Sequence, residues 1–223
     1  MIIDIFKDKQ LWEDLDKHTE TLTNLVNDYD FEKEDTSPWF NPIRFREYPL
    51  TTDIGGALNT NPLPQDSKYK LLLYCANYPA VCVINKLFDK DILIEDYACG
   101  ATYFSYYMSK LGFNKYSLFD NFSQVNRELF DKVVNYSKIT FTLNDSTQKP
   151  DVVNIVGYPW YEKEILDAEL FCIYPCDNMF KTVIHTLTKK GYIELCRDSD
   201  YTQLFYCKHE RQAEWQKKLS LLE

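Results

Sequence analysis

Glycine is scarce in this sequence, with 6 residues among 223. Glycine usually makes up about 7% of a protein. Each of the few glycines here is therefore expected to mark a tight turn or the close approach of the backbone to another group. The scarcity also excludes a collagen-like chain and a flexible glycine-rich chain.

Long apolar runs and export signals are missing too. The longest nearly uncharged stretch, residues 71–84, is interrupted by Asn77 and Pro79 and is shorter than the roughly 18 apolar residues that a membrane span requires. The first ten residues mix acidic and basic side chains, unlike a signal peptide. We therefore expect a cytoplasmic protein whose 7 cysteines are reduced thiols. Cys172 and Cys176 are spaced like a metal clip, but no second Cys/His pair completes a zinc site, so we expect no metal.

An excess of positive charge is absent as well. The chain has 25 Lys and Arg against 34 Asp and Glu, which gives a net charge of -9. A protein that neutralises phosphate groups usually presents a basic face, and no run of Lys or Arg supplies one. The composition disfavours nucleic acid and membrane surfaces as partners. A small-molecule substrate is the expected partner, and a protein substrate stays possible.

The N-terminal part of the chain, residues 1–70, is expected to form a helix followed by an irregular cap or lid segment. Leucines recur at helical spacing between Leu11 and Leu25, which predicts a helix over about residues 1–30. Five prolines then interrupt residues 31–67. Aromatic and basic side chains are interleaved in this segment, and Trp39 and Arg44 are the predicted substrate-binding residues. They either pack across the surface of the core or cover a site in which an arginine binds an anionic group.

Residues 71–223 alternate strand and helix patterns, which predicts an α/β domain with a mainly parallel sheet covered on both faces. The link between the last two strands is short and polar, so they form an antiparallel hairpin. The predicted strands are 92–96, 116–120, 139–143, 151–156, 170–174, 192–196 and 203–207. The predicted helices are 80–88, 104–111, 125–134, 161–167 and 177–187, with a charged helical tail after His209.

Polar and small residues follow the ends of the predicted strands, where open α/β sheets bind ligands. The first strand ends in Asp96-Tyr97-Ala98-Cys99-Gly100 and leads into a helix, whose N-terminus offers free N–H groups. Asp120 ends the second strand, 24 residues after Asp96, and an acid there can accept the hydroxyls of a ribose. The third strand ends in Asn144-Asp145, whose polar groups suit an adenine edge.

Residues 92–208 resemble the Rossmann-like (class I) S-adenosylmethionine-dependent methyltransferases. Residues 94–100 resemble the first motif of this family, an acid followed by small residues and glycines, and the closing hairpin matches the family's topology. The resemblance implies a seven-stranded Rossmann-like doubly wound sheet and S-adenosylmethionine as cofactor. The residues implied to bind the cofactor are Asp96, Tyr97, Ala98, Gly100, Asp120, Asn121 and Asp145. The chain departs from the family at Ala98 and Thr102, where glycines are usual.

The fourth predicted strand is followed by Gly157-Tyr158-Pro159-Trp160, which resembles the family's Pro-Pro-aromatic motif for amino-group methylation. Tyr158 and Trp160 are therefore also predicted to bind the substrate, in addition to Trp39 and Arg44, and they are the candidates for catalysis. The alternative is that the segment is only a turn after a buried strand. No general base is identified. The sequence predicts a methyltransferase that acts on a small-molecule acceptor. The alternative is a methyltransferase-like fold that has lost catalysis and serves as a binding or interaction module.

Overall fold

The computed structural model describes residues 1–4, 7–27, 77–120, 124–145, 147–156, 167–174, 180–198 and 203–222. The irregular segment predicted for residues 31–67 and the boundary predicted at residue 70 lie outside these ranges. The helix predicted for 161–167 lies outside them except for its last residue.

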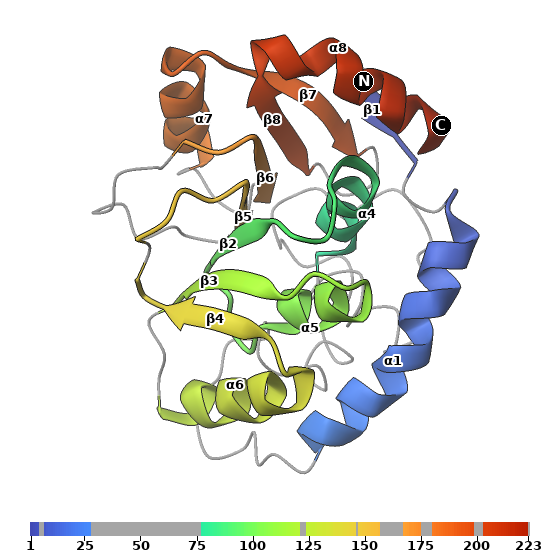
Figure 1. Ribbon diagram of the computed structural model, residues 1–223, viewed down its shortest axis with the longest axis vertical. Helices are drawn as coiled ribbons and strands as arrows, with labels where there is room; N and C mark the ends of the chain where they lie inside the picture. Colours follow the sequence, from blue (N-terminus) through green and yellow to red (C-terminus); the bar gives the residue numbers. More distant parts are fainter. Residues whose placement is uncertain are drawn as a thin grey trace.

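A sheet of eight strands runs through the centre of the protein (Figure 1). The spatial order is β1-β7-β8-β6-β5-β2-β3-β4. β8 is antiparallel to both of its neighbours, β6 and β7, and every other described pairing is parallel. The strands are β1 (Ile2–Ile3), β2 (Leu93–Tyr97), β3 (Lys115–Phe119), β4 (Thr140–Leu143), β5 (Val152–Val156), β6 (Leu170–Tyr174), β7 (Tyr192–Asp198) and β8 (Leu204–Lys208).

This arrangement confirms the predicted fold class, a Rossmann-like doubly wound sheet that ends in an antiparallel hairpin. The chain order reverses beside β2: β3 and β4 lie on one side of β2, and β5 and β6 lie on the other. Ligands of open α/β sheets bind at such a switch point, outside the carboxyl ends of the strands. The end of β2 is therefore the place where a ligand site is expected.

The eighth strand, β1, was not predicted. It pairs in parallel with the end of β7, where Ile2 is opposite Arg197 and Ile3 is opposite Asp198. The backbone N–H of Arg197 donates to the carbonyl of Met1 at 2.9 Å. A strand of two residues is too short to show an alternating pattern and could not be predicted. The N-terminal helix, predicted over about residues 1–30, begins only at Lys9.

Helices cover both faces of the sheet (Figure 1). The larger buried cluster includes side chains from five helices, and the smaller one on the opposite face includes side chains from α7 (Phe180–Lys189). The five are α1 (Lys9–Asn27), α4 (Tyr78–Leu87), α5 (Tyr103–Lys110), α6 (Gln124–Ser137) and α8 (Gln212–Leu219), with 3-10 turns at His209–Arg211 and Ser220–Leu222. Among the described residues, no helix has the length and apolar character needed to cross a bilayer.

α1 belongs to the same core as the sheet. Its predicted stripe is buried at Leu11, Leu15 and Leu22, in one cluster with Ile94 of β2. The Thr19 and Tyr107 hydroxyls form a buried hydrogen bond of 2.8 Å between α1 and α5. The N-terminal helix thus packs on the outside of the helical layer.

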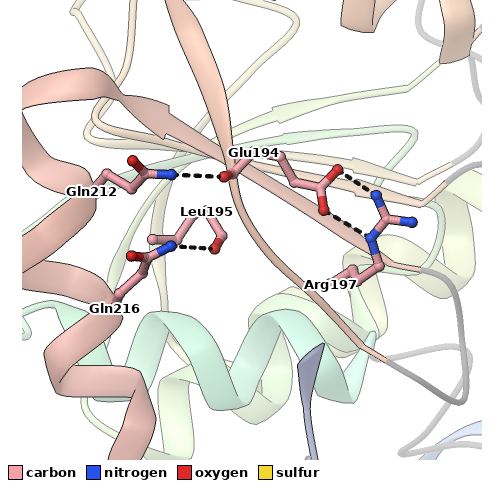
Figure 2. Close-up of polar contacts among 5 residues, drawn as sticks. All are labelled: Glu194, Leu195, Arg197, Gln212 and Gln216. Atoms are coloured by element: carbon pink, nitrogen blue, oxygen red, sulfur yellow. Dashed lines mark hydrogen bonds and ion pairs between the residues drawn. The ribbon is translucent and has the colours of Figure 1, made fainter. Parts of the chain in front are cut away.

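α8 donates hydrogen bonds to β7 at a β-bulge. The β7–β8 register shifts between Glu194 and Cys196, which leaves Leu195 without an opposite residue. Two glutamines one helical turn apart on α8 donate to consecutive β7 carbonyls: Gln212 to Glu194 at 3.2 Å and Gln216 to Leu195 at 3.4 Å (Figure 2). A bidentate ion pair between Arg197 and Glu194 spans the same bulge on its exposed side (Figure 2).

Replacing both glutamines by alanine tests the importance of this contact. We expect the double variant Gln212→Ala/Gln216→Ala to lose about 1–2 kcal/mol in the free energy of unfolding, because two carbonyls lose their donors. Urea unfolding measures the loss, and Lys217→Ala, at an exposed position of α8, is the matched control. Equal stabilities for the double variant and the control would show that the bulge does not depend on α8.

Candidate functional site

The loop that joins β2 to α5 has an unusual backbone. Ala98, Gly100 and Thr102 have φ angles of +57°, +54° and +57°. These are the three positions at which the methyltransferase family usually has glycine. The loop therefore has a left-handed backbone at all three positions, although two of them carry alanine and threonine instead of glycine.

This backbone carries strain. A left-handed conformation costs an L-residue roughly 1–2 kcal/mol, and it is a marked outlier for a β-branched residue such as threonine. Thr102 is completely buried, and its hydroxyl has no hydrogen-bond partner among the described residues. Strained residues of this kind persist where the surrounding structure imposes them, and they concentrate at ligand sites.

Hydrogen bonds to the end of β3 hold the loop in place. The Gly100 N–H donates to Asp120 Oδ2 at 2.7 Å, and the Cys99 N–H donates to the Phe119 carbonyl at 3.1 Å. A third bond, from the Thr102 N–H to the Cys99 carbonyl at 2.7 Å, closes the turn before α5. The structure thus brings together Gly100 and Asp120, two of the predicted cofactor-binding residues.

Asp96, a third predicted cofactor-binding residue, lies in β2 two residues before Ala98, with only 1% of its surface exposed. Its Oδ1 accepts a hydrogen bond of 2.7 Å from the amide of Asn154, whereas its Oδ2 has no hydrogen-bond partner among the described residues. Burial raises the pKa of Asp96 to about 7, the Asn154 amide opposes this shift, and the charge of Asp120 adds to it. Oδ2 is therefore a buried acceptor whose hydrogen-bonding capacity is unused among the described residues.

Tyr97 follows Asp96 in β2, so its side chain lies on the opposite face of the sheet. Its ring stacks on Phe119, with 4.9 Å between the ring centroids and 14° between the planes. Burial, with the Glu95 carboxylate nearby, raises the pKa of the Tyr97 hydroxyl. The stack joins the ends of β2 and β3 on the face opposite Asp96, and a cofactor contact by Tyr97 stays a prediction.

Asn144, beside the predicted residue Asp145, makes the contact that fixes Asp120. Its side-chain amide donates to the Asp120 carbonyl at 3.0 Å and accepts from the Asp120 N–H at 3.1 Å. Asn144 has a φ of +52°, a conformation that asparagine tolerates better than most residues. The Asp145 side chain is exposed, and its backbone carbonyl accepts a hydrogen bond of 2.7 Å from Thr142.

Other predicted site residues lie outside the described residues: Asn121, Trp39, Arg44, Tyr158 and Trp160. Sequence reasoning did not identify Asn77 and Asn154 as site residues. Both are buried, and Asn154 is connected directly to Asp96. An asparagine within the apolar run 152–156 was the one available signal, since a buried amide requires partners.

Changing single loop residues to glycine tests the strain. We expect Ala98→Gly to raise the free energy of unfolding by about 0.5–1 kcal/mol, because relief of the left-handed penalty exceeds the added freedom of the unfolded chain. Ala101→Gly is the matched control, since Ala101 is not among the residues with positive φ, and it should lose about 0.5–1 kcal/mol. Chemical denaturation measures both. A loss of stability in both variants would contradict the left-handed backbone at Ala98.

The buried Asp96 predicts a specific dependence of stability on pH. Its pKa is about 7 in the folded protein and about 3.9 in an unfolded chain. The unfolded state therefore releases the proton first, and the stability due to the protonated folded form is lost as the pH rises from about 4 to 7. We expect stability to fall relative to Asp96→Asn by up to about 1.4 kcal/mol per pH unit in this range.

Urea unfolding of the wild-type protein and Asp96→Asn between pH 4 and 8 measures this difference. Asp131→Asn is the control, because Asp131 lies on the surface in an ion pair with Arg127. A difference between the wild-type protein and Asp96→Asn that stays constant with pH would contradict the raised pKa.

No protein-family model matches the sequence, and no curated protein matches it either. Solved methyltransferase structures are similar to this fold at low sequence identity. One is precorrin-6y C5,15-methyltransferase from Geobacter metallireducens, with 15% identity over 66% of this chain and 83% of that chain and a TM-score of 0.42. Another is the ribosomal protein L11 methylase from Lactobacillus delbrueckii subsp. bulgaricus, with 16% identity over 60% and 79% of the two chains and a TM-score of 0.45. A third is a putative RNA methyltransferase from Pyrococcus horikoshii, with 11% identity over 75% and 96% and a TM-score of 0.41.

Proposed function

We propose that this protein is an S-adenosylmethionine-dependent methyltransferase that acts on a small-molecule acceptor. The observation that carries the proposal is the left-handed backbone at Ala98, Gly100 and Thr102, the three glycine positions of the family's first motif. The loop follows the strand at the switch point of a sheet in which β8 is inserted antiparallel between β6 and β7. That strand order is the topology expected from the sequence resemblance.

The residues around the loop fit a cofactor with hydroxyl groups and positive charge. In this proposal Asp120 accepts from the ribose and Asp96 accepts a hydrogen bond through Oδ2. We assign Asn121 and Asp145 to the adenine, as expected from the sequence. S-adenosylmethionine supplies a methyl group that is already activated by its positively charged sulfur. The two carboxylates of Asp96 and Asp120 lower the electrostatic energy of such a cation near the loop.

Methyl transfer leaves the protein with two tasks: to align the acceptor with the methyl group and to exclude water. Trp39, Arg44, Tyr158 and Trp160 are the residues that we assign to the acceptor, as expected from the sequence. Aromatic faces attract cations, which suits a positively charged group at this position. The net charge of -9 supports a small molecule over a nucleic acid as acceptor.

One observation favours the alternative function, a catalytically inactive binding module. Ala98 and Thr102 occupy two of the three positions at which the family usually has glycine. The side chain of Thr102 is completely buried at the start of α5. A Cβ at these positions reduces the space in which a ligand can approach the backbone. A module of this kind could still bind the cofactor or its product without turnover.

Calorimetric titration of the pure protein with S-adenosylmethionine, its demethylated product and NAD tests the proposal. We expect the first two to bind and NAD not to bind. Asp120→Ala should weaken the affinity for S-adenosylmethionine at least tenfold, equivalent to about 1.4 kcal/mol, because the ribose loses its acceptor and Gly100 loses its anchor.

Two variants sharpen this test. Asp91→Ala removes an exposed carboxylate that pairs with Lys115, and it should leave the affinity unchanged. Asp120→Asn keeps an acceptor oxygen but removes the charge, so it separates hydrogen bonding from electrostatics. The enzyme proposal fails if neither S-adenosylmethionine nor its product binds, and binding without turnover over a broad panel of acceptors would favour the inactive module.

A further inference from the structure

Asn77 begins α4 in an unusual way. Its backbone is left-handed, with φ +53° and ψ +56°, and its side chain does not cap the helix. An asparagine at this position usually accepts a hydrogen bond from the first turn through its side chain. Here the backbone carbonyl accepts from Ala80 and Val81 instead, at 2.9 and 3.2 Å, and the side chain is directed elsewhere.

The amide of Asn77 donates to the side-chain oxygen of Asn154 on β5, at 2.8 Å. Asn154 in turn donates through its own amide nitrogen to Asp96 Oδ1, at 2.7 Å. Asn154 presents its NH2 group to Asp96 and its carbonyl oxygen to Asn77. This orientation suits an ionised Asp96 carboxylate, which only accepts hydrogen bonds.

All three side chains are buried: Asn77 is 3% exposed, Asn154 is 0% exposed and Asp96 is 1% exposed. A buried amide that loses a partner costs about 1–3 kcal/mol, so the chain of bonds is stable only when it is complete. It joins α4 and β2, which are consecutive in the sequence, to β5, whose Asn154 lies 58 residues after Asp96. Figure 1 shows α4 between α8 and α5, on the side of the sheet to which these three helices contribute core residues.

We propose that Asn154 and Asn77 are positioning residues that hold Asp96 for the ligand of the 98–102 loop, so that the first turn of α4 is coupled to the ligand site. Asn154 bonds to Oδ1 only, so Asp96 Oδ2 is buried and has no hydrogen-bond partner among the described residues. Because coupling is reciprocal, a ligand that donates to Oδ2 and favours the carboxylate strengthens the bond from Asn154 and, through it, the bond from Asn77. The identity of the ligand rests on the proposed function, whereas the positioning of Asp96 does not.

Titratable groups from several elements interact electrostatically with Asp96. They are Asp120 after β3, Cys99 in the loop, Tyr116 on β3 and Cys172 on β6. Burial raises the pKa of the Cys99, Tyr116 and Cys172 side chains, and the charge of Asp96 adds to each shift. The Cys99, Tyr116 and Cys172 side chains are neutral in the pH range in which Asp96 titrates. The charge that acts on Asp96 is therefore that of Asp120.

The test measures the proton affinity of Asp96 by carboxyl carbon NMR in the wild-type protein, Asn154→Leu and Asn77→Gly. Leucine replaces the Asn154 amide by an apolar group of similar size, and glycine adopts the left-handed backbone of Asn77 without strain. We expect Asn154→Leu to raise the proton affinity of Asp96 about tenfold. Asn77→Gly should raise it less, since it acts through Asn154. Asn135→Leu, on the exposed side of α6, should leave it unchanged.

A second readout is the affinity for S-adenosylmethionine between pH 6 and 9. We expect both variants to bind more weakly at neutral pH and to regain affinity at higher pH, where Asp96 is again ionised. In the Asp96→Asn background, removing the Asn154 amide should have no additional effect, which identifies Asp96 as the residue through which Asn154 acts.

The outcomes separate the two proposals. An unchanged Asp96 titration in both variants would overturn the positioning role, even if the cofactor binds normally. If the wild-type protein does not bind S-adenosylmethionine, the proposed function fails, and the NMR titration still decides whether the asparagines position Asp96. If Asn154→Leu does not fold, Asn77→Gly alone decides the same question.

Discussion

The hydrogen bond between the Gly100 N–H and the Asp120 carboxylate is the contact on which the candidate site depends. It fixes the middle of a loop that has to turn from a buried strand into α5 with three left-handed residues. The loop directly follows Asp96 and Tyr97, and Asp96 is almost completely buried. Asn144 completes the arrangement by bonding to both backbone groups of Asp120, so that the ends of β2, β3 and β4 form one unit.

Two carboxylates close to one loop create an electrostatic conflict that the protein resolves by unequal burial. Asp120 is partly exposed and receives a backbone donor, whereas Asp96 is buried and receives one amide. Environments that push the pKa values of two neighbouring acids apart are common at functional sites. The difference gives this site one buried carboxyl group, Asp96, whose pKa is raised to about 7, next to the partly exposed carboxyl group of Asp120.

The fold could be predicted largely from the sequence, because each central strand is an apolar run and each helix has a periodic stripe. Gly112 and Gly191 follow the ends of α5 and α7 and have positive φ, at +96° and +83°, as is typical of glycines after a helix. The site could be predicted only where a residue type has a typical place, as with Asp96 and Asp120 at strand ends. The left-handed backbone of Ala98 could not be predicted, because alanine rarely adopts it. Nor could the roles of Asn77 and Asn154, because their partners lie 77 and 58 residues away.

The pairing of β1 with β7 has a consequence for how this protein is made. Ile2 and Ile3 pair with Arg197 and Asp198, so β1 cannot join the sheet until β7 has been synthesised. During synthesis α1 and its apolar stripe are exposed before the helices on which they pack exist, and such surfaces bind chaperones or associate with other chains. β1 and α8 both contact β7 (Figure 1), so a permuted chain in which a linker leads from α8 into β1 would make the β1–β7 pairing local in sequence and remove this delay.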